Sequence, residues 1–108
     1  MILWDGGNND TPFYKPTVHI TVVDPLRPGH ELRYFPGRTN FELADVILLN
    51  KMGQAKPEDV AVIRRNISEH NAGAIVLEAN SPVTVADEEA IRGKRVLVVE
   101  DGPTVTHG

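Results

Sequence analysis

The hydrophobic residues of this chain gather in short runs that are separated by polar and turn-forming residues. Five such runs lie at Met1–Trp4, Val18–Val23, Val46–Leu49, Ala74–Leu77 and Arg95–Val99. Most of them are uniformly apolar rather than alternating, which is typical of strands that are buried on both faces of a parallel sheet. We therefore expect a mostly parallel sheet of about five short strands.

The segment between the third and fourth runs has the periodicity of an amphipathic helix. Val60, Ile63 and Ile67 fall on one helical face, whereas Arg64 and Arg65 point elsewhere. The ends of this predicted helix carry start and stop residues, which are Pro57, Glu58 and Asp59 at the beginning and Asn71 and Gly73 at the end.

Two weaker helical segments complete the pattern, a short helix over Asp87–Arg92 that Gly93 closes and a single turn over Asn40–Ala44. Strands alternating with helices predict the α/β class with right-handed crossovers. Because so few helices serve the strands, we expect one face of the sheet to lack cover. Residues 1–108 then form either a single α/β domain or a fragment of a larger one, completed by a second copy or by further segments of a longer chain.

The composition narrows the classes of partner. The chain has 11 Lys and Arg against 15 Asp and Glu, a formal charge of −4, which argues against binding to nucleic acid or to an anionic membrane. It has no cysteine, so disulfides and thiolate chemistry are excluded, and its apolar runs are too short for a membrane span. A cytoplasmic location fits these features.

The first predicted strand ends at Asp5, Gly6 and Gly7. Ligands of open parallel sheets bind at the carboxyl ends of the strands. One carboxylate beside phosphate oxygens suffices for Mg²⁺, and glycines let the backbone approach a phosphate closely. Asp5 is therefore a candidate magnesium ligand in a nucleotide site, and the alternative is a tight turn.

Two further strand ends offer candidates for binding a nucleotide base. Asn50 and Lys51 follow the third strand, as in the Asn-Lys-x-Asp motif of GTPases. Gly53 stands where that motif has its aspartate. Selectivity for guanine is therefore unsupported, and adenine becomes a plausible base. Asn80 and Ser81 follow the next strand, where such folds place a second base-contacting loop. The alternative for both loops is an ordinary strand-end turn.

Arg27, His30 and Arg33, with Arg38 nearby, form the one concentrated positive group. The planar guanidinium suits phosphate or carboxylate, although a solvated loop with surface ion pairs is the alternative. The histidines lack metal-ligand spacing, and no catalytic residue can be assigned. A G-x-x-x-x-G-K-[ST] motif, which would cradle the phosphates, is absent.

Three strings resemble the cyclic 2,3-diphosphoglycerate synthetase family, whose members are P-loop proteins of a GTPase-like type. The strings are Ile2–Asp10, Val23–Glu31 and Val98–Thr104. The resemblance runs through the whole chain, and it corresponds to an internal segment that follows the family's phosphate-binding loop.

The resemblance implies an ATP- and magnesium-dependent enzyme that closes 2,3-diphosphoglycerate into a cyclic phosphoanhydride, releasing ADP and phosphate. It places Asp5 at the metal, Gly6 and Gly7 near the γ-phosphate, and Asn50 and Lys51 in the base loop. Arg27, His30 and Arg33 become candidates for the doubly phosphorylated substrate. On its own, a segment without the phosphate cradle is expected to be inactive.

Two alternatives come from other classes of function. One is a non-catalytic module that binds a nucleotide or a phosphorylated metabolite through the strand-end loops. The other is a structural domain that pairs its open sheet with another chain.

Overall fold

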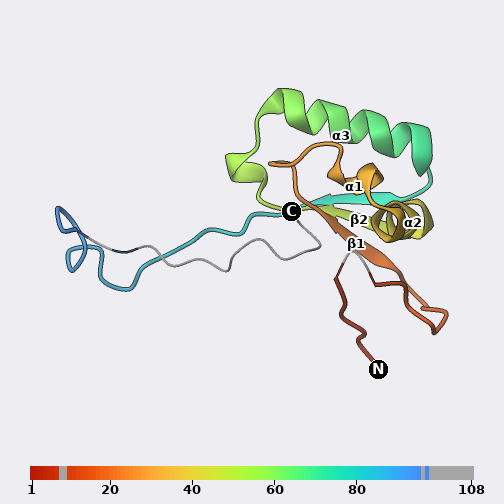
Figure 1. The fold of residues 1–108 in the computed structure, drawn as a ribbon, viewed down its shortest axis with the longest axis horizontal. Coiled ribbons are helices and arrows are strands. Elements are labelled where there is room, and N and C mark those ends of the chain that lie inside the picture. The colour runs from red at the N-terminus through yellow and green to blue at the C-terminus, as the bar shows by residue number, and fades with distance from the viewer. Residues whose placement is uncertain (8–9, 96, 98–108) are drawn as a thin grey trace.

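The computed structural model describes residues 1–7, 10–95 and 97 of the chain. In this part of the chain, strands and helices alternate in an α/β arrangement (Figure 1). The strands are β1 (Ile20–Val23), β2 (Val46–Leu49) and β3 (Ile75–Glu78). The helices are α1 (His30–Arg33), α2 (Phe35–Leu43) and α3 (Pro57–His70), with a short 3₁₀ turn, η1, at Met52–Gln54.

The three strands form one parallel sheet in the order β1-β2-β3. Their register aligns Ile20 with Val46 and Val46 with Ile75, so residues of the same parity share a face across the sheet. Both connections step in the same direction. Since crossovers between parallel strands are nearly always right-handed, two such steps place their helices on the same face.

The core lies between that face and the helices. The buried side chains of the strands are Val23, Ile47 and Leu49. They form one cluster with Phe41 and Ala44 at the end of α2 and with Ile63 and Ile67 of α3. The predicted apolar face of the helix at Pro57–His70 is thus confirmed, and Arg64 and Arg65 are exposed as expected.

In the described part of the chain, no helix packs on the opposite face of the sheet, which is apolar, as the small number of predicted helices indicated. Its outer strands present Ile20, Val22, Ile75 and Leu77, each half or more exposed. The expectation that the strands are buried on both faces is therefore wrong for the described chain. The cause is the topology, because both helical connections pack on the other face.

Two predicted elements are absent from the structure, and a third predicted element lies mostly outside the residues that the structure describes. Met1–Trp4 is an exposed segment without strand pairing, and Asp87–Arg92 forms turns rather than a helix. After β3 the chain leaves the sheet, and residues 80–95 extend away from it (Figure 1), so no described helix or strand lies against Asp87–Arg92. The strand predicted at Arg95–Val99 lies mostly outside the described residues.

The segment between β1 and β2 is more helical than expected. Gly29 has φ 91° and allows the turn that leads into α1, and its N–H donates to Glu31 Oε2 at 2.9 Å. The nine-residue helix α2 begins at Phe35 and ends at Leu43, and it has Pro36 in its first turn, where a missing N–H costs nothing. The prediction of a single turn over Asn40–Ala44 therefore found only the last part of this helix.

None of the helices in the described chain is both long and apolar enough to cross a membrane.

Candidate functional site

Polar side chains from the loops after β2 and β3 lie together at the carboxyl edge of the sheet. Ser81 Oγ donates to Asn50 Oδ1 at 2.9 Å, and the Gly53 N–H donates to Asn80 Oδ1 at 2.5 Å. The backbones are joined as well, because the Met52 N–H donates to the Ala79 carbonyl at 3.0 Å. The predicted grouping of Asn50, Asn80 and Ser81 is therefore present in the structure.

Lys51 joins the loop after β1 to the same edge. Its ammonium donates to Asp24 Oδ2 at 2.8 Å. Its backbone has φ 59° and ψ 29°, a left-handed conformation that is uncommon for a residue with a side chain. Asn50 Oδ1 supports this conformation by accepting the Lys51 N–H at 2.9 Å. Strained backbone of this kind is concentrated at functional sites.

Asp24 is a residue of this edge that was not predicted from the sequence. Partial burial acts to raise the pKa of its carboxyl group. The hydrogen bonds from Lys51 and from the Leu26 N–H, with the positive charges of Lys51 and Arg27, outweigh burial, so the pKa is lower than usual. Its position in the sequence could have identified it, because Asp24 follows a strand directly, and Asn50 and Asn80 were identified by their positions after strands.

A cavity of about 220 Å³ opens beside these loops. Its walls are Lys51, Gly53, Gln54, Asn80, Ser81 and Pro82. It is smaller than a typical site for a complete cofactor. Its lining offers an ammonium, two side-chain amides and a hydroxyl, which together can bind the phosphate or the polar edge of a larger ligand.

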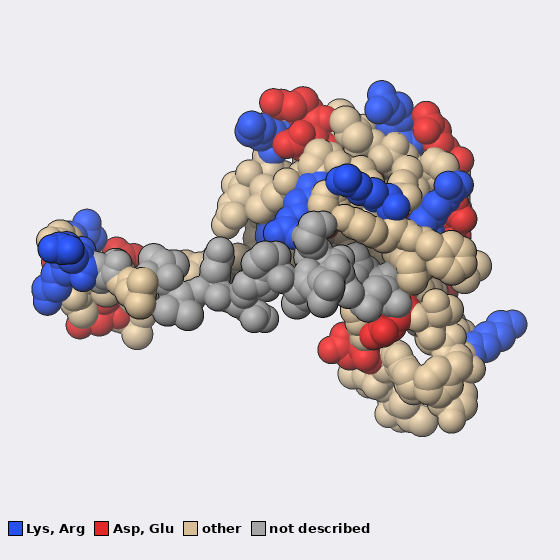
Figure 2. Space-filling view, viewed as in Figure 1, with Lys and Arg blue, Asp and Glu red and all other residues tan. Residues whose placement is uncertain are grey.

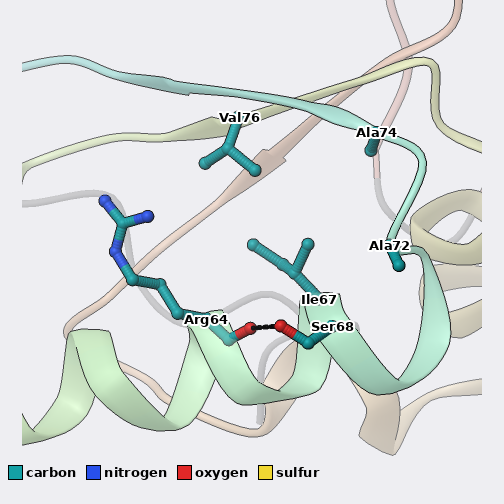
Figure 3. A pocket seen from close by; sticks show the side chains of 6 residues that line it. All are labelled: Arg64, Ile67, Ser68, Ala72, Ala74 and Val76. Carbon is teal, nitrogen blue, oxygen red and sulfur yellow. Dashed lines mark hydrogen bonds between the residues drawn. The ribbon is translucent and has the colours of Figure 1, made fainter.

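A larger hollow of about 370 Å³ lies between α3 and β3 (Figure 3). It is lined by Arg64, Ile67, Ser68, Ala72, Ala74 and Val76. The Ser68 hydroxyl donates to the Arg64 carbonyl at 3.0 Å, and the Arg64 guanidinium pairs with Glu78. Four of its six lining residues are aliphatic, whereas four of the six at the carboxyl edge carry polar side chains, so the carboxyl edge is the better candidate site.

Gly53 allows the loops after β2 and β3 to approach each other. A Cβ atom at this position would lie 3.0 Å from Asn80 Oδ1, at the limit of what real Cβ contacts show. In this conformation, the loop therefore does not accommodate the aspartate of the Asn-Lys-x-Asp motif.

We expect Gly53→Asp to break the bond between the two loops and to destabilise the chain by about 1–2 kcal/mol. Gly73→Asp is the matched control, because a Cβ at Gly73 has no atom within 4 Å, and it should change stability by less than about 0.5 kcal/mol. Urea unfolding measures both variants. Equal stabilities would contradict the tight contact at Gly53.

The basic residues of the loop after β1 are only partly brought to this edge. Arg27 is close enough for its charge to lower the pKa of Asp24. His30 and Arg33 instead lie against Tyr34, with a ring separation of 5.9 Å for His30 and 6.0 Å from the guanidinium carbon of Arg33 to the ring centre. Figure 2 shows lysine and arginine side chains gathered over α1 and the neighbouring end of the sheet.

The placement of Asp5, Gly6 and Gly7 at a strand end is wrong for this structure. The residues before them form no strand, and all three are exposed. Gly7 is in a turn in which its N–H donates to Asp10 Oδ2 at 3.2 Å. Trp4 packs edge-on against Phe13, with ring centres 4.8 Å apart. The apolar run failed to form a strand because no described strand pairs with it to satisfy its backbone groups.

Asp5 is the candidate magnesium ligand, and it lies on the N-terminal segment that precedes β1. In the described part of the chain, no three His, Cys, Asp or Glu side chains gather where they could hold a metal ion. Asp5 is an exposed carboxylate on an irregular segment. As a single carboxylate it would supply one oxygen ligand, and phosphate oxygens of a nucleotide would have to supply others.

Comparison with known proteins places this chain beside a synthetase. All 108 residues align with arginine synthetase ArcE from Thermococcus kodakarensis at 59% identity. The aligned region covers 24% of that protein, so the chain spans about a quarter of its length. No family model and no solved structure matches the chain. The chain is therefore similar to one segment of a synthetase.

Proposed function

We propose that this chain is a segment of an ATP-dependent synthetase, and that its carboxyl edge binds part of a nucleotide or of a phosphorylated intermediate. The observation that carries the proposal is the set of three strand-end loops joined by Asp24, Asn50, Lys51 and Asn80 beside a polar cavity. Open parallel sheets bind their ligands at this position.

Among the described residues, the sheet has helices on one face alone, and this supports the assignment to a segment. Parallel sheets are ordinarily covered on both faces, and the opposite face of this sheet is apolar and half exposed. The relative has additional length that could supply the missing layer. The same additional length could also provide a phosphate cradle, since this chain has no such motif.

The product we favour is arginine. The name of the relative gives arginine as its product, and the identity of 59% extends over the whole of this chain. In this function, the carboxyl edge would serve ATP, and Arg27 would lie beside the same ligand.

Closure of 2,3-diphosphoglycerate into a cyclic phosphoanhydride is the second candidate. It is favoured by the resemblance of Ile2–Asp10, Val23–Glu31 and Val98–Thr104 to that family. Of the residues it implicates, Arg27 lies near the carboxyl edge, whereas His30 and Arg33 lie against Tyr34.

One experiment separates the two products in a polypeptide that carries this chain with the remaining length of the relative. Because a synthetase can be run in reverse, arginine, ADP and phosphate should yield ATP, which luciferase detects without knowledge of the precursor. In parallel, ATP and 2,3-diphosphoglycerate are incubated, and ³¹P NMR follows the appearance of a cyclic anhydride. ATP formation that depends on arginine would support the favoured product, and a cyclic anhydride would support the second.

Lys51→Met should lower the rate of the supported reaction at least tenfold, because a charge-assisted hydrogen bond to a phosphate oxygen contributes about 1.5–3 kcal/mol. Lys15→Met, an exposed lysine of the N-terminal segment, is the matched control and should leave the rate unchanged. Equal rates in the two variants would contradict a role for the carboxyl edge.

A further inference from the structure

The ion pair of Asp24 and Lys51 lies at the carboxyl edge, where a phosphate-bearing ligand would need a positively charged partner. Lys51 forms one wall of the cavity, yet its ammonium is engaged by Asp24 Oδ2 at 2.8 Å. The two side chains remain 32% and 40% exposed, for Asp24 and Lys51 respectively. An anion that reaches the cavity therefore meets a lysine whose charge is already balanced from within the chain.

The two partners differ in their freedom to move. Asp24 is fixed by its own turn, because its Oδ1 accepts the Leu26 N–H at 3.0 Å and its carbonyl accepts the Arg27 N–H at 3.0 Å. The backbone of Lys51 is fixed by Asn50, but its side chain is a flexible stem with a mobile ammonium. The ammonium can therefore exchange one anionic partner for another while Asp24 stays in place.

A second cation strengthens the effect of Asp24. The charge of Arg27 helps to lower the pKa of Asp24, so the carboxylate faces two positive groups and remains ionised at neutral pH. Removal of this negative charge would leave both cations without their shared counter-ion and would also remove its repulsion of an incoming phosphate.

We propose that Asp24 is an internal counter-ion that holds the Lys51 ammonium when the site is empty and is exchanged for a phosphate oxygen when a phosphate-bearing ligand binds. This proposal rests on the proposed function, because it describes how the charge of Lys51 at the same carboxyl edge is balanced when no ligand is bound. Asp24 is in this sense a positioning residue that weakens the binding of anions and restricts it to ligands able to displace a carboxylate.

Asp24→Asn tests the proposal, because the amide keeps the Oδ1 acceptor for the Leu26 N–H and loses only the charge. We expect the dissociation constants of inorganic phosphate and of ADP to fall about three- to tenfold in this variant, measured by calorimetry at constant ionic strength. Inorganic phosphate reports the anion alone, and a larger gain for ADP would identify a nucleotide as the source of the phosphate. Damage to the fold would weaken binding, so a gain separates this role from a purely structural one.

Three further variants make the result decisive. Lys51→Met should weaken phosphate binding, and Asp24→Asn should give no gain when combined with Lys51→Met, because the charge that Asp24 balances is gone. Glu69→Gln removes an exposed carboxylate of α3 and controls for net charge alone. An equal gain in Glu69→Gln would overturn the proposal.

The failures of the two proposals are distinguishable. If the original chain binds phosphate and Asp24→Asn binds it no more tightly, the counter-ion role is wrong and the proposed site stands. If neither binds phosphate or ADP, both proposals fail. An Asp24→Asn chain that does not fold, by circular dichroism, would also overturn the counter-ion role, because it would show that the charge serves the fold.

Discussion

Replacing Phe41 by alanine is expected to lower the free energy of unfolding by about 3–5 kcal/mol. Phe41 is fully buried near the end of α2, and it joins that helix to Val23 and Ile47 of the sheet and to Ile63 of α3. Truncation leaves a cavity that the neighbouring strands can fill only in part. For a domain of this size such a loss is a large share of the total stability.

Phe35→Ala provides a matched control in the same helix. Phe35 is 83% exposed, against 0% for Phe41, so its loss should change stability by less than about 0.5 kcal/mol. Thermal and urea unfolding, both followed by circular dichroism, measure the two variants. Similar losses in the two would show that the core is not built around Phe41.

The parts of the fold that the sequence predicted are those whose signals are local. The helix from Pro57 to His70 has its proline and acidic residues at the start, its apolar face inside and Asn71 at its end. Val46–Leu49 was predicted at its observed bounds, because a compact apolar run between polar residues has few other ways to be buried. The strands at Ile20–Val23 and Ile75–Glu78 also agree within two residues.

The parts that were mispredicted depend on contacts distant in the sequence. Met1–Trp4 has a strand-like composition, but a strand also needs a neighbour for its backbone, and none is described beside it. Asp87–Arg92 has acidic residues at its start and Gly93 at its end, yet no apolar surface of the described residues packs against it. Short helices gain most of their stability from such packing.

The candidate site follows the same division. Asn50, Lys51, Asn80 and Ser81 could be grouped from sequence, because parallel strands bring their carboxyl ends to one edge. The pairing of Lys51 with Asp24 could not be predicted, because it depends on β1 and β2 being neighbours in the sheet. The approach of Gly53 to Asn80 likewise depends on the position of η1 beside the loop after β3.

The asymmetry of the sheet predicts opposite outcomes for two adjacent valines. Val22 is 59% exposed on the face where no described helix packs, and Val23 is 3% exposed in the core. Val23→Asp should destabilise the chain by about 3–5 kcal/mol, because an unpaired carboxylate would be buried among aliphatic side chains. Val22→Asp should cost about 1 kcal/mol or less, the range of strand propensities at an exposed position.

Urea unfolding of both variants checks this difference, and sedimentation at several concentrations tests a second consequence. An exposed aliphatic face promotes association, so Val22→Asp should reduce any self-association of the original chain. If Val22→Asp proved as destabilising as Val23→Asp, the second face would be covered in solution. A further layer, besides the two helical connections on the first face, would then have to pack against Val22.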